Sequence, residues 1–205
     1  GRDWKRANYD TGWRAGETVI TGIGQGYLLT TPLQLVVMTA ALANGGKLVT
    51  PTLLAGQSAQ AQPRPIGVAP EHLAIVQQGM YRAVNKPDGT AYASSLLIGN
   101  QRMSGKTGTV QVRRISLTER EEGVIPNSEL DWHLRDHALF VGYVPHRAPR
   151  YAISVVIEHG GGGGQVAAPI ARDIMVDLLR SQETPPPPAT PTPKAAASAN
   201  PGESS

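Results

Sequence analysis

The sequence predicts an α+β fold in which helices pack on a mainly antiparallel sheet. Three observations lead to this prediction: a helical segment that is apolar on nearly every side, three strand-like runs of which two are joined by a short link, and an amphipathic segment after the last run. Of the 205 residues, 40% are hydrophobic, which is enough for a core. The formal net charge of +3 does not argue for a nucleic-acid-binding protein, and the absence of cysteine excludes disulfide bonds and thiolate metal sites.

The first predicted helix begins at Pro32 and ends before the Asn-Gly-Gly segment at 44–46. Thr31 can cap its N-terminus, proline suits the first helical position, and glycine is typical after a helix end. Its interior, LQLVVMTAALA, is apolar nearly all round but too short for a membrane span, which predicts a buried helix. A second helix is predicted over 70–84, where apolar residues form one stripe, and a Pro-Asp-Gly turn follows at 87–89.

Three strand-like runs follow, over 109–115, 137–144 and 151–158. The last two are separated only by the link PHRAPR, which predicts an antiparallel hairpin. The segment VAAPIARDIMVDLLR at 166–180 predicts an amphipathic closing helix. A polar insert at 114–136 separates the first two strands, and its length is compatible with a functional lid and equally with an ordinary surface insertion.

The composition changes at residue 183, which divides the chain into a folded part at 1–182 and a tail at 183–205. Seven of the 17 prolines lie in the tail, and large apolar side chains are almost absent there. Such a segment cannot bury enough surface to offset its ordering entropy, so we predict a disordered, polyproline-II-biased tail. The other end begins at Gly1 without methionine, signal segment or transmembrane run, which fits either a mature soluble protein or the back end of a longer one.

The segment SGKTGTVQV at 104–112 places a lysine before a strand pattern. Gly105, Lys106 and Thr107 match the end of a phosphate-binding P-loop. That motif requires another glycine five positions before the glycine that precedes its lysine, and Asn100 stands there instead. A P-loop also leads into a helix, whereas alternating apolar and polar residues follow here. The sequence therefore argues against a nucleotide site at this lysine.

Other glycine and histidine clusters also carry weak signals. The segment at 22–26 has Tyr27 where a dinucleotide fingerprint requires glycine or alanine. Five glycines at 160–164 link a strand to a helix, a place where anions can bind, but a flexible turn explains them better. One histidine and aspartate cluster resembles a zinc site, but neighbouring strand residues point to opposite faces, so a solvated loop end is the favoured interpretation. Its members are Asp131, His133, Asp136 and His137.

A lysine on an edge strand fits acyl-transfer chemistry. A K-T-G triplet is one of the motifs of serine acyl-transfer enzymes that react with penicillin. The ammonium of Lys106 would hold the carboxylate of an acyl donor and favour deprotonation of nearby hydroxyls, and the hydroxyls of Thr107 and Thr109 can bond the same carboxylate. Gly108 lets a substrate backbone lie against the strand as an added β-partner. The backbone N–H of Thr109 can form half of an oxyanion hole.

Four segments in this order carry a family resemblance: GIGQGYLLTTPLQL, SGKTGTVQV, RDHALFVGYVP and VVIEHGGGGGQVAAPIARDIM. Together they resemble the C-terminal half of the transpeptidase domain of class B penicillin-binding proteins, and within that family the transpeptidases of cell elongation. The resemblance covers roughly residues 10–179. It implies the penicillin-binding, β-lactamase-like fold and a D,D-transpeptidase that cross-links peptidoglycan stem peptides through a serine acyl-enzyme, without a cofactor or metal.

The resemblance also implies site residues and partners. The partners would be peptidoglycan stem peptides, β-lactams, a SEDS-type glycosyltransferase and a scaffold protein of the elongation machinery. The location would be the periplasmic face of the bacterial inner membrane, with membrane contact only through an anchor outside this sequence. The residues carried over are one catalytic lysine, three substrate-binding residues and three supporting residues: Lys106; Thr107, Gly108 and Thr109; Gly24, Gln25 and Gly26.

The sequence departs from this family at the nucleophile. No Ser-x-x-Lys occurs, and the only Ser-x-Asn, at 198–200, lies in the predicted tail. We therefore expect a C-terminal fragment whose missing half carries the serine and the membrane anchor, and which is inactive alone. Three alternatives share this half: the division-specific relative, a β-lactam-sensing domain, and a non-catalytic module that binds cell-wall peptide or a partner of the division or elongation machinery.

Overall fold

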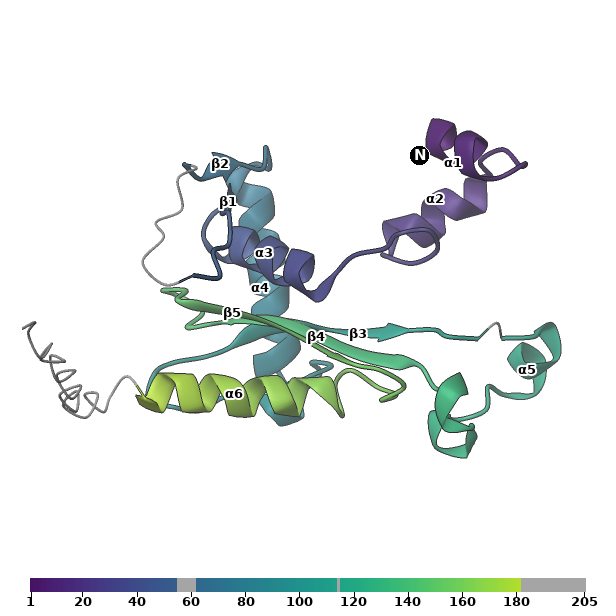
Figure 1. The fold of residues 1–205 in the computed structure, drawn as a ribbon. Helices are drawn as coiled ribbons and strands as arrows, with labels where there is room; N and C mark the ends of the chain where they lie inside the picture. The colour runs from purple at the N-terminus through teal and green to yellow at the C-terminus, as the bar shows by residue number, and fades with distance from the viewer. Residues whose placement is uncertain (55–61, 114, 182–205) are drawn as a thin grey trace, which may run out of the picture.

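The computed structural model describes residues 1–181 except 55–61 and 114, so the predicted tail at 183–205 lies outside the described residues. In chain order the elements are α1 (Arg2–Asn8), α2 (Ala15–Gly22), α3 (Pro32–Ala43), β1 (Lys47–Leu48), β2 (Arg64–Pro65), α4 (Pro70–Asn85), η1 (Tyr92–Ser94), β3 (Ser104–Val110), α5 (Leu117–Glu122), η2 (Asn127–Glu129), η3 (Trp132–Leu134), β4 (His137–Val144), β5 (Tyr151–Ile157) and α6 (Ala167–Ser181). The α+β prediction is confirmed: β3, β4 and β5 form an antiparallel sheet in that order, with α6 along one face and α3 over the other (Figure 1).

The predicted hairpin is confirmed, but the predicted limits of the first strand are wrong. The strands β4 and β5 pair from Val144 opposite Tyr151 onward, as the short link between them requires. The strand β3 covers Ser104–Val110 instead of 109–115. Its last residue, Val110, pairs with His137, where β4 begins, so the chain beyond Val110 has no strand to pair with in this sheet.

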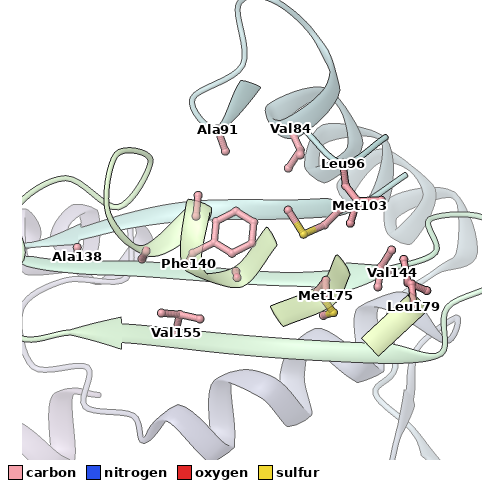
Figure 2. Close-up of a cluster of buried hydrophobic side chains, with 13 residues drawn as sticks. Val84, Ala91, Leu96, Met103, Ala138, Phe140, Val144, Val155, Met175 and Leu179 are labelled. Carbon is pink, nitrogen blue, oxygen red and sulfur yellow. The ribbon is translucent and has the colours of Figure 1, made fainter. Parts of the chain in front are cut away.

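The main core lies between the sheet and α6. Phe140 and Val144 of β4 are fully buried against Met175 of α6, and Figure 2 shows the Phe140 ring among the side chains of this cluster. Tyr143 points to the opposite face of β4, where it packs with Ala43 of α3 and with α4. The alternation along β4 therefore gives both faces of the sheet a hydrophobic layer.

The helix α3 begins as predicted but is not buried all round. Thr31 Oγ1 accepts a hydrogen bond from the backbone N–H of Gln34, and the Gln34 side chain accepts one from the backbone N–H of Thr31, which is a capping box. Leu33 and Met38 are 50% and 45% exposed. The prediction of a buried helix is wrong at these two residues, because the strands β4, β5 and β1 and the helix α4, which contact α3, leave both side chains exposed. The predicted second helix is confirmed as α4.

Two short N-terminal helices, α1 and α2, escaped prediction. They are joined by an ion pair between Lys5, which is only 2% exposed, and Glu17. The backbone N–H of Arg14 and the ammonium of Lys5 both hold the pKa of the Glu17 carboxyl below its usual value. Figure 1 shows this pair of helices standing apart from the sheet. No helix among the described residues is both long and apolar enough to cross a bilayer.

The insert between β3 and β4 contains regular structure that its polar composition concealed. The helix α5 begins with a capping box in which Ser116 and Glu119 bond each other's backbone N–H groups. Arg113 donates two hydrogen bonds to the Glu119 carboxylate, at 2.8 and 2.7 Å. These contacts lower the pKa of Glu119 from 4.5 to about 2, with the Arg113 bond as the main cause and the Ser116 backbone N–H next.

This low pKa predicts acid sensitivity of α5. The folded-state pKa lies below the unfolded value. The Glu119 carboxylate therefore stabilises the folded state above pH 4.5, and this stabilisation is lost as the pH falls towards 2. Amide hydrogen exchange of α5 should therefore accelerate, relative to the intrinsic rate, over this range. In Glu119→Gln the helix should exchange faster already at neutral pH, with no further acid step, whereas the exposed Glu121→Gln should behave as wild type. A Glu119 carboxyl that titrates near 4.5 by NMR would contradict the ion pair.

Candidate active site

The strand β3 places Lys106 at the open edge of the sheet. The only strand that pairs with β3 among the described residues is β4, on its other side. Lys106 pairs with Val141 and its side chain is exposed. Its Nζ donates a hydrogen bond to the backbone carbonyl of Thr107 at 2.7 Å and lies 3.4 Å from Thr107 Oγ1. The lysine therefore bends over the strand edge and presents its ammonium there.

Thr107 and Thr109 lie on the other face of β3 from Lys106, because strand residues alternate. Thr107 Oγ1 donates to Thr90 Oγ1 at 2.9 Å, just after the predicted turn that follows α4. Thr109 is exposed. The lysine ammonium reaches the hydroxyl of Thr107, at 3.4 Å, and the expectation that the hydroxyls of Thr107 and Thr109 bond one substrate carboxylate stays a prediction. An ammonium beside a hydroxyl on an open strand edge can bind a carboxylate.

The glycine-rich segment after β5 packs directly against the lysine strand. A Cβ placed on Gly163 would lie 2.3 Å from the carbonyl oxygens of both Gly108 and Leu139. A Cβ on Gly164 would lie 2.3 Å from the carbonyl oxygen of Thr90. Two backbones can approach this closely only without side chains. Close packing therefore requires glycine at 163 and 164, and the interpretation of 160–164 as a flexible turn stays a prediction.

The second predicted group, Gly24, Gln25 and Gly26, forms the turn that ends α2. The two glycines have φ of +79° and +77°, a left-handed conformation that favours glycine, and the backbone N–H of Gln25 donates to Ile20 O at 3.1 Å. Figure 1 shows this end of α2 apart from β3. The structure therefore does not bring the turn to Lys106.

The histidine and aspartate cluster in the insert does not converge. His137 Nδ1 accepts a hydrogen bond from the backbone N–H of His159, while Asp136 accepts one from the side chain of Asn127. Within residues 1–54, 62–113 and 115–181, no three histidine, aspartate or glutamate side chains are grouped as a metal site.

Sequence reasoning missed a polar network at the start of β3. Ser104 is completely buried, and its Oγ lies 2.8 Å from Nδ1 of His146 in the β4–β5 turn. The hydroxyl of Tyr143 lies 3.4 Å from the same nitrogen. A serine bonded to a histidine has the geometry of an activated nucleophile, but a fully buried hydroxyl cannot reach a substrate. In the sequence, only the position of Ser104 could have drawn attention to it. Ser104 precedes Lys106 by two residues, so the two side chains lie on the same face of β3.

Residues 5–176 match the family described as "Penicillin binding protein transpeptidase domain". A curated relative, the peptidoglycan D,D-transpeptidase MrdA of Haemophilus influenzae, is 38% identical over 193 residues, which are 90% of this chain and 29% of the relative. The chain thus spans less than a third of the length of this relative. The family match over residues 5–176 includes the whole of β3 and the glycine-rich segment at 160–164.

Two solved structures resemble the chain. The penicillin-binding protein PBP2 of Helicobacter pylori, solved in complex with MreC, superposes with a TM-score of 0.74 at 30% identity, covering 89% of this chain and 31% of that one. Pseudomonas aeruginosa PBP2, solved in complex with WCK 5153, gives a TM-score of 0.68 at 37% identity, covering 87% and 36%.

Proposed function

Since the chain belongs to the penicillin-binding protein transpeptidase family, we propose that it supplies the lysine strand of a peptidoglycan D,D-transpeptidase. The observation that carries this proposal is the exposed ammonium of Lys106, held beside the Thr107 hydroxyl at an edge of β3 with which no other described strand pairs. In this role Lys106 is the catalytic residue of the strand, and Thr107, Gly108 and Thr109 bind the substrate. The turn formed by Gly24, Gln25 and Gly26 supports the structure of the domain at a distance.

The donor stem peptide would lie along β3 as an added strand. Its terminal carboxylate would meet Lys106 and the hydroxyl of Thr107, and the N–H of Thr109 would donate to the oxygen of the carbonyl under attack. A serine oxygen adds to that carbonyl and forms an ester, while the terminal residue leaves as an amine that takes up the serine proton. The amine of a second stem peptide then displaces the serine, so the cross-link forms and the serine regains its proton.

The serine of this reaction has no match in the 205 residues, because no Ser-x-x-Lys occurs in them. We propose that it belongs to the part of the transpeptidase domain that these residues do not include. The limited coverage of the relatives supports this, and so does the exposed apolar surface. Leu29 and Leu53 are each 92% exposed, and the outer side of α3 is also apolar and uncovered by the described residues. Such surfaces are typical of faces that pack against further protein.

We propose a role in cell elongation. The H. pylori PBP2 structure is a complex with MreC, which supports a scaffold protein as a partner of this chain as well. A SEDS-type glycosyltransferase partner, a periplasmic location at the inner membrane and a role in cell shape are parts of the same proposal. The missing nucleophile motif favours one second candidate, a non-catalytic module that binds cell-wall peptide.

Fluorescent penicillin separates these two functions. The test uses the full-length gene product, meaning the natural polypeptide that contains this chain. We expect covalent labelling of that protein, blocked by prior treatment with unlabelled penicillin, and no labelling of the 205-residue chain alone. A folded full-length protein that takes no label would refute the transpeptidase and leave the binding module.

A further inference from the structure

We propose that His146 is a positioning residue for Lys106: with Ser104 it holds the start of β3, so that the lysine reaches the open edge of the sheet. This inference rests on the proposed function, since it assigns a task within the lysine strand. His146 touches no substrate in this proposal. It acts only through the strand.

His146 holds the start of β3 with both its backbone and its side chain. Its backbone N–H donates to the carbonyl of Arg102 at 2.8 Å, and its Nδ1 lies 2.8 Å from Ser104 Oγ. The hydroxyl of Tyr143, on the strand that pairs with Ser104, lies 3.4 Å from the same nitrogen. The ring of Tyr81 in α4 packs on the imidazole with a centroid distance of 4.7 Å. Residues of β3, β4 and α4 thus meet at the imidazole of His146.

The helix α4 holds the other side of the residues that lead into β3. Asn85 Nδ2 donates to the carbonyl of Met103 at 2.8 Å and also to Tyr81 O at 2.8 Å. The Oδ1 atom of Asn85 is buried and has no hydrogen-bond partner among the described residues. The two hydrogen bonds that Nδ2 donates fix the orientation of the amide, although the unpartnered Oδ1 is a cost of it. The residues before β3 are therefore held by His146 on one side and Asn85 on the other.

The position of Ser104 determines that of Lys106. The two residues lie on one face of β3, about 6.6 Å apart along the strand, and they pair with Tyr143 and Val141 of β4. Only Gly105 separates them. A Cβ there would lie 2.2 Å from Cζ of Phe140, so the backbone at Gly105 already rests on the core. Because a slip of one residue would turn Lys106 to the other face, holding Ser104 in register also holds the lysine.

The network favours a neutral imidazole. With Nδ1 unprotonated, Ser104 donates to it; protonation would reverse this bond and place a charge in a half-buried site beside Arg147. Burial lowers the pKa of His146, and the charge of Arg147 lowers it further. Burial also raises the pKa of Tyr143, so this hydroxyl stays protonated. Among the described residues, the titratable and charged groups that face the imidazole are Tyr81, Tyr143 and Arg147, and none of them is a carboxylate that would stabilise a histidinium.

The test measures the second-order rate of acylation by fluorescent penicillin between about pH 5 and pH 8, with the full-length gene product. We expect His146→Leu to acylate about tenfold more slowly per folded molecule at neutral pH, because a small displacement of a catalytic group is enough for such a loss. In His146→Asn the side-chain oxygen can take the place of Nδ1 and accept from Ser104 without titrating. We expect it to acylate as wild type at neutral pH and to lack the part of the acid decline that His146 protonation causes in wild type.

His72→Leu is the matched control, because His72 is an exposed histidine of α4 outside this network and should leave rate and pH profile unchanged. Equal rates for His146→Leu and wild type, or superimposable pH profiles for His146→Asn and wild type, would overturn the inference. If His146→Leu does not fold, the profile of His146→Asn decides alone. A wild-type protein that takes no label refutes the proposed function, and this inference with it. Labelling that depends on Lys106 but not on His146 refutes only the inference.

Discussion

Replacing Lys106 by alanine in the full-length gene product is expected to lower the second-order rate of penicillin acylation by about a hundredfold or more. The ammonium lies at the strand edge, 2.7 Å from the carbonyl of Thr107 and 3.4 Å from its hydroxyl, where it would bind the donor carboxylate. Its loss removes the positive charge that the anionic substrate would meet. The side chain is exposed, so the variant should fold and melt as wild type does.

The measurement is the initial rate of labelling at several penicillin concentrations. Lys106→Arg keeps the charge with a different shape and should retain part of the rate, because the two cations are not interchangeable where geometry matters. Lys47→Ala removes another exposed lysine, in β1, and should have no effect. A Lys106→Ala protein that acylates at the wild-type rate would show that this strand does not carry the catalytic lysine.

Replacing Gly163 by alanine is expected to destabilise the protein clearly. The new Cβ would lie 2.3 Å from the carbonyl oxygens of Gly108 and Leu139, both of which are backbone atoms that cannot rotate away. Either the glycine-rich segment or β3 must move, which should cost about 1–3 kcal/mol of stability. Because Gly108 is two residues from Lys106, the acylation rate of the folded fraction should also fall.

Gly162→Ala is the matched control for this substitution. Its new Cβ would meet only the end of the Gln165 side chain, at 2.7 Å, and that side chain can rotate away. Thermal unfolding of the two variants beside wild type is the measurement, with a clear loss for Gly163→Ala and a small one for Gly162→Ala. Equal melting temperatures would mean that the close approach to β3 does not constrain the segment.

Three of the six described α-helices, α3, α4 and α6, and two of the strands, β4 and β5, could be predicted because their signals are local. Thr31 and Pro32 start α3 through a cap and a fixed φ that involve only neighbouring residues. The limits of β4 follow from a run of apolar and β-branched residues that ends at a proline. The K-T-G triplet predicts a catalytic role for Lys106 in the same way, because the motif consists of three adjacent residues.

Other features depend on residues that are distant in the sequence. The end of β3 at Val110 is set by His137, where its partner strand begins, and not by the β-forming residues that follow Val110. Ser104 and His146 are 42 residues apart in the sequence, and no local pattern around either residue predicts that they are in contact. The packing of Gly163 on Gly108 likewise depends on residues that are distant in the sequence.

The sequence by itself therefore determined the class of fold, the order of the main elements and the lysine triplet, because propensity, capping and motif chemistry act over a few residues. Only the tertiary structure decided where β3 ends, which threonine the lysine reaches and what holds the strand in register. The physical reason is that these depend on pairing and packing, in which each residue's environment is made by chain segments far from it in sequence.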